Sequence, residues 1–159
     1  MKSNDNESSM KDFEVIKTAG QGSYGTVFKV KRKADGVIYA IKSLKIYKMD
    51  KKNMTNTLNE IRILCSIDHP YIVGYKEAFV DKSSNELDIV MEYVGGGALS
   101  EKIKNCEKRK LYLNEKMIWR YFLQILQGLK CLHSMKIIHR DIKSANLFLS
   151  EDMETVKVG

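Results

Sequence analysis

The sequence predicts an α+β fold of two lobes, in which a β-rich lobe with one helix precedes a mainly helical lobe. Three observations predict it. Segments rich in β-branched and aromatic residues fill most of residues 13–94, three consecutive glycines follow at 95–97, and a long amphipathic helical pattern comes after them. We expect residues 1–12 to form a disordered tail, 13–94 the first lobe with its connection to the second, and 95–159 the start of the second lobe.

The first lobe is expected to contain five strands and one helix. The dipeptide Asp35-Gly36 is a strong hairpin signal between the second and third strands. A stripe of apolar residues at helical spacing predicts a helix over 53–67, and Pro70 lies beyond its end, where proline does not continue a helix. The expected strands are 13–20, 26–34, 37–44, 71–80 and 86–94.

The second lobe is expected to begin with a long helix over 114–135, with Asn114 as its N-cap. Its apolar residues cover so wide an arc that we expect packing neighbours on more than one side. With only residues 95–159 in this lobe, we expect much of that apolar surface to be exposed. Arg120 and Gln124 indicate a water-facing side rather than a membrane helix. Short strands are expected near 136–138, 146–149 and 155–158.

Composition and charge argue against several classes of protein. The chain has 159 residues, 43% hydrophobic and 30% charged. It has no apolar run near the roughly 18 residues that span a bilayer and no secretory signal at its polar start. The net charge of +7 comes from lysines spread along the chain without interleaved aromatic residues, which favours a solvated basic face over specific nucleic-acid binding. The three cysteines are far apart, with no CxxC pair, and are expected to be reduced cytosolic thiols.

The segment GQGSYGTV at residues 20–27 has the pattern GxGxxGxV. A dinucleotide-binding fingerprint would open a helix after its strand, whereas Gly25 leads into an alternating, β-branched stretch. A glycine loop between two strands can cover nucleotide phosphates, because glycines allow close approach and present N–H donors. A purely structural hairpin loop is the alternative.

Lys42 lies in the expected third strand, in the sequence YAIK. Most strand lysines are surface residues, so a functional role requires a carboxylate that holds the ammonium group. Glu60, on the helix that follows, is the candidate. A Lys42–Glu60 pair would position the ammonium group to bridge two phosphates of a nucleotide.

The segment HRDIKSAN at residues 139–146 is the most specific element of the sequence. Asp141 can accept a proton from a hydroxyl group or orient that hydroxyl for attack. Lys143 can neutralise a transferred phosphoryl group. Asn146 offers an amide oxygen, a ligand suited to Mg²⁺.

In their order and spacing, these motifs resemble the eukaryotic protein kinases, and Lys143 indicates the serine/threonine class. The stretches LNEIRILCSIDHPYIVGYKEAF and HRDIKSANLFLS resemble the NIMA-related kinases. The resemblance covers residues 13–159 and implies a bilobal kinase-like fold, with a complete first lobe and a truncated second lobe. It implies ATP and Mg²⁺ as cofactors and Ser or Thr residues of proteins as substrates. It also implies a cytoplasmic location, with cytoskeletal, ciliary or regulatory partners.

The resemblance also implies which residues contact the nucleotide. Met91 matches the gatekeeper, and Glu92 to Val94 match the hinge whose backbone groups hydrogen-bond adenine. Ordinary core packing is the alternative role for the apolar strand residues of the set. The implied nucleotide contacts are Gly20, Gln21, Gly22, Ser23, Tyr24, Gly25, Val27, Ala40, Lys42, Met91, Glu92, Val94 and Phe148.

Two departures from the family's pattern bear on function. Where the family often carries an acidic residue that reaches the ribose, this chain has Ala98, a loss of roughly 1 kcal/mol. In the family, Asp-Phe-Gly follows a strand like the one ending at Gly159, and its Asp holds Mg²⁺. We therefore expect residues 1–159 to be a fragment whose Mg²⁺-dependent transfer is undetectable. The alternative function is a catalytically inactive module that binds a nucleotide or a protein partner.

Overall fold

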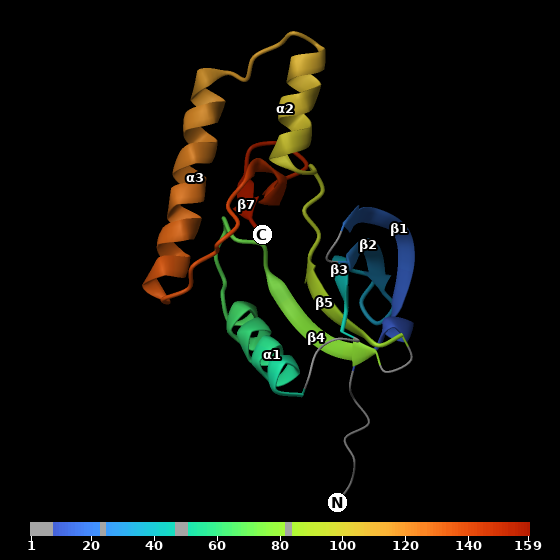
Figure 1. Ribbon diagram of the computed structural model, residues 1–159. Helices are drawn as coiled ribbons and strands as arrows, with labels where there is room; N and C mark the ends of the chain where they lie inside the picture. Colours follow the sequence, from blue (N-terminus) through green and yellow to red (C-terminus); the bar gives the residue numbers. More distant parts are fainter. Residues whose placement is uncertain (1–7, 23–24, 47–50, 82–83) are drawn as a thin grey trace, which may run out of the picture. The chain divides into compact units, whose positions relative to one another are not determined.

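The computed structural model describes residues 8–22, 25–46, 51–81 and 84–159, without the side chains of 51–56 and 60. The chain forms two compact units (Figure 1). The first comprises Met1–Ile67 and Gly74–Tyr93, and the second comprises Asp68–Val73 and Val94–Gly159. The division after Tyr93 lies one residue before the expected lobe boundary.

The first unit contains a five-stranded antiparallel sheet with the strand order β1-β2-β3-β5-β4 (Figure 1). Its strands are β1 (Phe13–Gly22), β2 (Gly25–Arg32), β3 (Ile38–Lys45), β4 (Tyr75–Asp81) and β5 (Glu86–Glu92). All five predicted strands are present, but the expected start of the fourth at residue 71 is wrong. Residues 71–73 belong to the second unit, where Ile72 forms a parallel bridge with Val158. A partner far along the chain therefore decides their structure.

The sheet has an apolar core on each face, because successive strand residues point to opposite sides. The first core consists of Phe13, Val30, Tyr39, Ile41, Phe79 and Val90. The second consists of Ile46, Ile61, Leu87 and Ile89. Helix α1 (Lys51–Cys65) supplies Ile61 to the second core. This helix is the predicted one, and it ends before Pro70 as expected.

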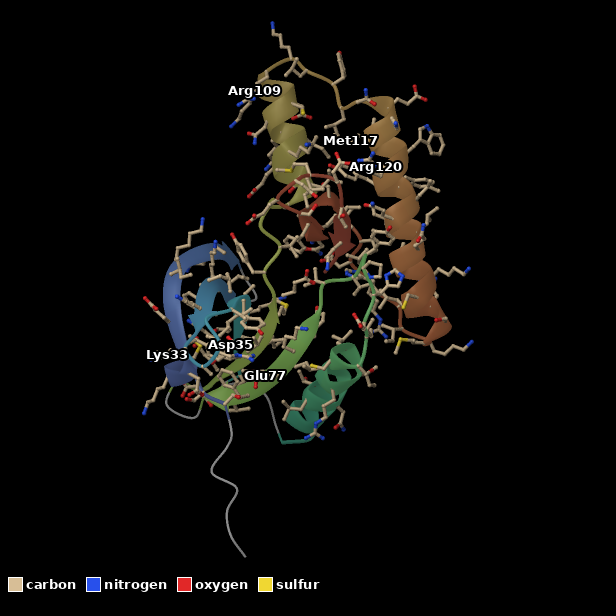
Figure 2. The ribbon with its side chains drawn as sticks, turned by 180° about the vertical axis from the view of Figure 1, so that it is seen from behind. Lys33, Asp35, Glu77, Arg109, Met117 and Arg120 are labelled. Atoms are coloured by element: carbon tan, nitrogen blue, oxygen red, sulfur yellow. The ribbon has the colours of Figure 1, made fainter. Side chains whose placement is uncertain are left out.

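The residues that precede β1 pack onto the first core. Met10–Asp12 form the 3-10 turn η1, and Met10 packs against the core cluster. The Ser8 hydroxyl donates to Glu77 Oε2 at 2.6 Å, and Arg32 Nη2 donates to Glu77 Oε1 at 2.9 Å. Glu77 is labelled in Figure 2. Residues 8–12 of the expected tail therefore contact the sheet.

The second unit consists mainly of two helices and a short hairpin. Its elements are α2 (Leu99–Lys108), α3 (Glu115–Ser134), η2 (Ser144–Asn146), β6 (Leu147–Leu149) and β7 (Val156–Val158). The sequence analysis missed α2, a largely polar helix in which only Leu99 is buried. The strand expected near 136–138 is wrong. Lys136 adopts a left-handed φ of 63° and Ile138 is 69% exposed, so neither the backbone nor burial supports a strand there.

Helix α3 confirms the predicted N-cap, since the Asn114 side chain accepts a hydrogen bond from the Lys116 N–H at 2.8 Å. Its buried side packs through Tyr121, Gly128 and Leu132. The exposed apolar side chains on the same helix are Ile118, Trp119, Phe122, Leu123 and Leu126, as the wide apolar arc predicts. Within the described part of the chain, every helix is too short or too polar to cross a bilayer.

Candidate active site

The glycine-rich segment joins β1 to β2 as a hairpin. Gly20 lies opposite Val27 and Gly22 opposite Gly25 in the β1–β2 ladder. The predicted residues Ser23 and Tyr24 lie outside the described residues. Because the glycines lead into a strand and not a helix, the dinucleotide-binding alternative does not apply.

Gly25 is required by its surroundings. Its φ is +142°, and a Cβ at this position would overlap the carbonyl oxygen of Ser43 on β3. The loop therefore rests directly on the β3 backbone at this glycine, next to the predicted catalytic lysine.

One face of the sheet collects the predicted nucleotide contacts of the first unit. Directly opposite residues of an antiparallel pair project to the same face. Lys42 lies opposite Val27 on β2, and Ala40 lies opposite Met91 on β5. The register therefore places these four predicted residues on one face. Glu60 lies in α1, but its side chain is outside the described residues, so the Lys42–Glu60 pair stays a prediction.

The predicted hinge begins at the end of β5. The Glu92 N–H donates to the Gly74 carbonyl at 2.7 Å, and Glu92 Oε2 accepts from the Gly74 N–H at 3.1 Å. The ammonium group of Lys29 lies 4.2 Å from the ring centroid of Tyr93, in cation–π range. Neither Lys29 nor Gly74 was predicted from the sequence. Val94 belongs to the second unit.

In the second unit, the predicted catalytic residues come together. Asp141 Oδ2 lies 2.8 Å from Lys143 Nζ and accepts a hydrogen bond from Asn146 Nδ2 at 2.9 Å. The same amide nitrogen donates to the Asp141 backbone carbonyl at 2.9 Å. The side chains of Asp141 and Lys143 are 61% and 56% exposed, so their ion pair contributes little to stability. Both groups instead remain accessible to a ligand.

These contacts favour the ionised form of the Asp141 carboxylate. The hydrogen bond from Lys143 is the largest cause of a lowered pKa for Asp141, followed by the hydrogen bond from Asn146. An ionised carboxylate can accept a hydrogen bond from a substrate hydroxyl and orient it.

Backbone contacts fix the catalytic loop to its surroundings. The Asn146 N–H donates to the Lys143 carbonyl at 2.9 Å, and the Gly159 N–H donates to the Asn146 carbonyl at 3.0 Å. The Asp141 N–H donates to His139 Nδ1 at 3.3 Å. Arg140 has a φ of 66°, a conformation that costs a non-glycine residue on the order of 1 kcal/mol or more.

The glycines at 95–97 lie against the β6–β7 hairpin. The Gly96 N–H donates to the Leu149 carbonyl at 2.8 Å, and the Leu149 N–H donates to the Gly97 carbonyl at 2.8 Å. A Cβ on Gly96 would overlap the carbonyl oxygens of Leu149 and Ser150. Close backbone packing therefore explains why this position carries glycine. The predicted nucleotide contact Phe148 lies in β6 and bridges to Ala98.

Asn146 fits one position of a magnesium site. The side chain of Asn146 contacts Asp141 through Nδ2, and its Oδ1 is an oxygen ligand of the kind that Mg²⁺ prefers. The described residues contain no group of three or more His, Cys, Asp or Glu side chains that could hold a metal ion. Asn146 therefore stays a predicted Mg²⁺ ligand.

Helix α3 holds the β6–β7 hairpin, which directly follows Asn146, through side chains that sequence reasoning missed. Gln124 Nε2 donates to the Glu154 carbonyl at 3.2 Å, and Gln124 Oε1 accepts from the Val156 N–H at 2.8 Å. Tyr121 donates to the Met153 carbonyl at 2.5 Å, and Arg120, labelled in Figure 2, pairs with Glu154. These contacts could not be predicted from the sequence, because a polar residue on a helix suits a solvent-facing side equally well.

The fold and the loop define a class of protein that comparison with known families confirms. The family described as "Protein kinase domain" matches residues 13–159, and the chain belongs to this family. ATP and Mg²⁺ are the typical cofactors of protein kinases.

The individual relatives are NIMA-related serine/threonine kinases, as the motifs predict. The chain is 41% identical over 153 residues to the probable serine/threonine-protein kinase nek2 of Dictyostelium discoideum, covering 94% of this chain and 36% of the relative. It is 37% identical over 153 residues to the serine/threonine-protein kinase Nek2 of Homo sapiens, covering 93% of this chain and 34% of the relative. The chain is 41% identical over 150 residues to the serine/threonine-protein kinase Nek1 of Mus musculus, covering 94% of this chain and 12% of the relative. The chain thus spans about a third or less of these relatives.

Proposed function

We propose that the protein carrying this segment is a serine/threonine kinase, which transfers the γ-phosphoryl group of ATP to Ser or Thr hydroxyls of protein substrates. The observation that carries the proposal is the contact of Asp141 with both Lys143 and Asn146. This arrangement provides an ionised carboxylate, a cation and an amide oxygen within one loop.

Each group has a defined role in the transfer. Asp141 orients the substrate hydroxyl and accepts its proton as the oxygen attacks. Lys143 offsets the negative charge on the transferred phosphoryl group. Asn146 would hold Mg²⁺, which neutralises phosphate charge when bound. The pKa of Asp141 is lowered by Lys143 and Asn146, so the carboxylate is ready at neutral pH.

The first unit would supply the nucleotide contacts. Lys42, held by Glu60, would bind two phosphates beneath the glycine-rich loop. By the family resemblance, Val27 and Ala40 of this unit would contact the adenine ring, and Phe148 of the second unit is a further implied contact. The backbone from Glu92 to Val94 and the gatekeeper Met91 would complete the adenine site. The shared sheet face of Val27, Ala40, Lys42 and Met91 supports this assignment.

Phosphoamino-acid analysis tests the proposal. The full-length gene product that carries residues 1–159 is incubated with γ-labelled ATP, Mg²⁺ and a generic protein substrate. We expect label on Ser and Thr and its loss in the variant Lys42→Met. Label on Tyr alone, or label that survives this substitution unchanged, would contradict the assignment.

One observation favours a second function for residues 1–159 taken alone. Asn146 offers a neutral oxygen, and the described residues contain no group of three or more His, Cys, Asp or Glu side chains that could hold a metal ion. This segment by itself would then bind a nucleotide or a kinase partner without turnover. Nucleotide binding without transfer by a purified polypeptide of residues 1–159 would support it. The family resemblance favours the cytoplasm as the location, with cytoskeletal or ciliary partners.

A further inference from the structure

Asp88 is a buried carboxyl group in β5 that the proposed reaction does not use. Its relative exposure is 1%. The register places it directly opposite Ser43 on β3 and Phe79 on β4, so its side chain lies on the face of the first core. Val90, two residues along β5, belongs to that core. A carboxyl group at such a position requires an explanation.

Among the described residues, a hydrogen-bond partner is found for one oxygen of this carboxyl group. The Ser43 hydroxyl, itself on a residue with 3% exposure, donates a short hydrogen bond to Asp88 Oδ1. Asp88 Oδ2 is buried and accepts no hydrogen bond from the described residues. Burying an ionised carboxylate with an unsatisfied oxygen is costly, whereas a protonated carboxyl group avoids much of that cost.

The charges around Asp88 act in the same direction. Burial is the largest cause of its raised pKa, the Ser43 hydrogen bond opposes the rise, and Glu86 and Asp81 add to it. Glu86 and Asp81 lie opposite each other at the end of the β4–β5 ladder, and Lys45 of β3 lies opposite Glu86. From β2, the residue opposite Ser43 is the uncharged Thr26. Relative to an exposed aspartate, the folded protein therefore favours the neutral acid more.

Ser43 connects this buried pair to the glycine-rich loop. Its carbonyl oxygen occupies the space where a Cβ of Gly25 would lie, and Leu44 Cδ2 lies close to the same position. Ser43 also follows Lys42 directly in β3. A side-chain bond that fixes Ser43 consequently fixes the surface on which the loop rests.

We propose that Asp88 is a positioning residue, which acts through the Ser43 hydroxyl to hold the Gly25 end of the glycine-rich loop against β3. Ionisation of Asp88 adds the cost of a buried charge at this point of the sheet, so the loop is held more firmly at low pH than at high pH. The role in nucleotide binding rests on the proposed function. The contact that runs from Asp88 through Ser43 to Gly25 does not depend on the proposed function.

Hydrogen–deuterium exchange of the 159-residue chain, without nucleotide, tests this link. The variants are Ser43→Ala, Asp88→Ala and the near-isosteric Asp88→Asn, with Val90→Ala as a control that weakens the same core. We expect Ser43→Ala and Asp88→Ala to lower the protection factors of the amides of 25–28 about fivefold beyond the control, the factor for one ordinary hydrogen bond. Asp88→Asn keeps the acceptor for Ser43 and should restore the protection.

The pH dependence separates positioning from simple packing. The folded pKa of Asp88 is raised above 3.8, so the stabilising contribution is present at low pH and lost as the pH rises through the raised value. Between about pH 4 and about pH 8, the wild-type protection of 25–28 should fall, while that of Asp88→Asn stays constant. The proposal is overturned if both alanine variants match Val90→Ala, or if Asp88→Asn keeps the wild-type pH dependence.

A second arm measures the affinity for a trinitrophenyl derivative of ATP. Ser43→Ala should weaken binding about fivefold, and Asp88→Asn should bind like the wild type. If the exchange results hold but no protein binds the derivative, the positioning role stands and the proposed nucleotide site fails. If Ser43→Ala binds the derivative as the wild type does, the loop contact has no role in binding and that part of the proposal is wrong.

Discussion

Gln124 holds the β6–β7 hairpin, so its replacement by leucine should destabilise the second unit. The substitution removes the acceptor of the Val156 N–H, which belongs to a residue with 0% exposure. A buried donor without a partner costs about 1–3 kcal/mol. The lost bond to the Glu154 carbonyl is longer, at 3.2 Å, and adds about 0.5 kcal/mol. We expect the free energy of unfolding to fall by about 1.5–3.5 kcal/mol.

Urea denaturation measures this change directly. Trp119 is the only tryptophan of the chain and lies on α3, so its fluorescence reports the unfolding of the second unit. Gln124→Glu is the matched variant, because it keeps the acceptor for Val156 and loses only the donor. Leu123→Ala, at a position 53% exposed on the same helix, is the control for general effects on α3. The reasoning is refuted if Gln124→Leu is no less stable than Gln124→Glu and Leu123→Ala.

Three further predictions concern single contacts. Replacing Lys143 by Met should raise the pKa of Asp141 toward its ordinary 3.8, because the largest cause of its depression is removed; carbon-13 NMR titration of the carboxyl group checks this, and an unchanged pKa would contradict it. Asn114→Ala should cost about 1 kcal/mol in urea unfolding, since the N-cap acceptor is lost, and Asn114→Ser should restore most of it. Gly96→Ala should lower the melting temperature, because its Cβ would overlap two backbone carbonyls. A melting temperature equal to that of the wild type would contradict this, because it would show that the backbone at 95–97 shifts freely to make room.

Local patterns in the sequence were sufficient for most of the elements. The N-cap Asn114, the α1 helix and four of the five strands in the first unit depend on residues close in sequence, and all are present at about the expected positions. The start of β4 was wrong because residues 71–73 pair with β7, far along the chain. Helix α2 escaped prediction because it buries only Leu99, so its periodic apolar signal is weak.

In the candidate site too, a local motif could be predicted, whereas contacts between residues far apart in the sequence could not. The loop motif identified Asp141, Lys143 and Asn146, and the structure shows them in contact. The Ser43–Asp88 bond was not foreseen, because two polar residues in separate strands give no sign of their register. The pairing of Lys42 with Glu60 stays a prediction.

The most direct test of the central claim compares nucleotide affinity with phosphoryl transfer in one substitution, Asp141→Asn. The variant keeps the shape of the side chain but cannot accept the hydroxyl proton. Both quantities are measured on the full-length gene product. We predict that Mg²⁺·ATP binds to Asp141→Asn as it does to the wild type, while transfer to Ser and Thr falls by about 100-fold or more. Equal transfer by Asp141→Asn and the wild type would contradict the assignment of this loop as the catalytic centre.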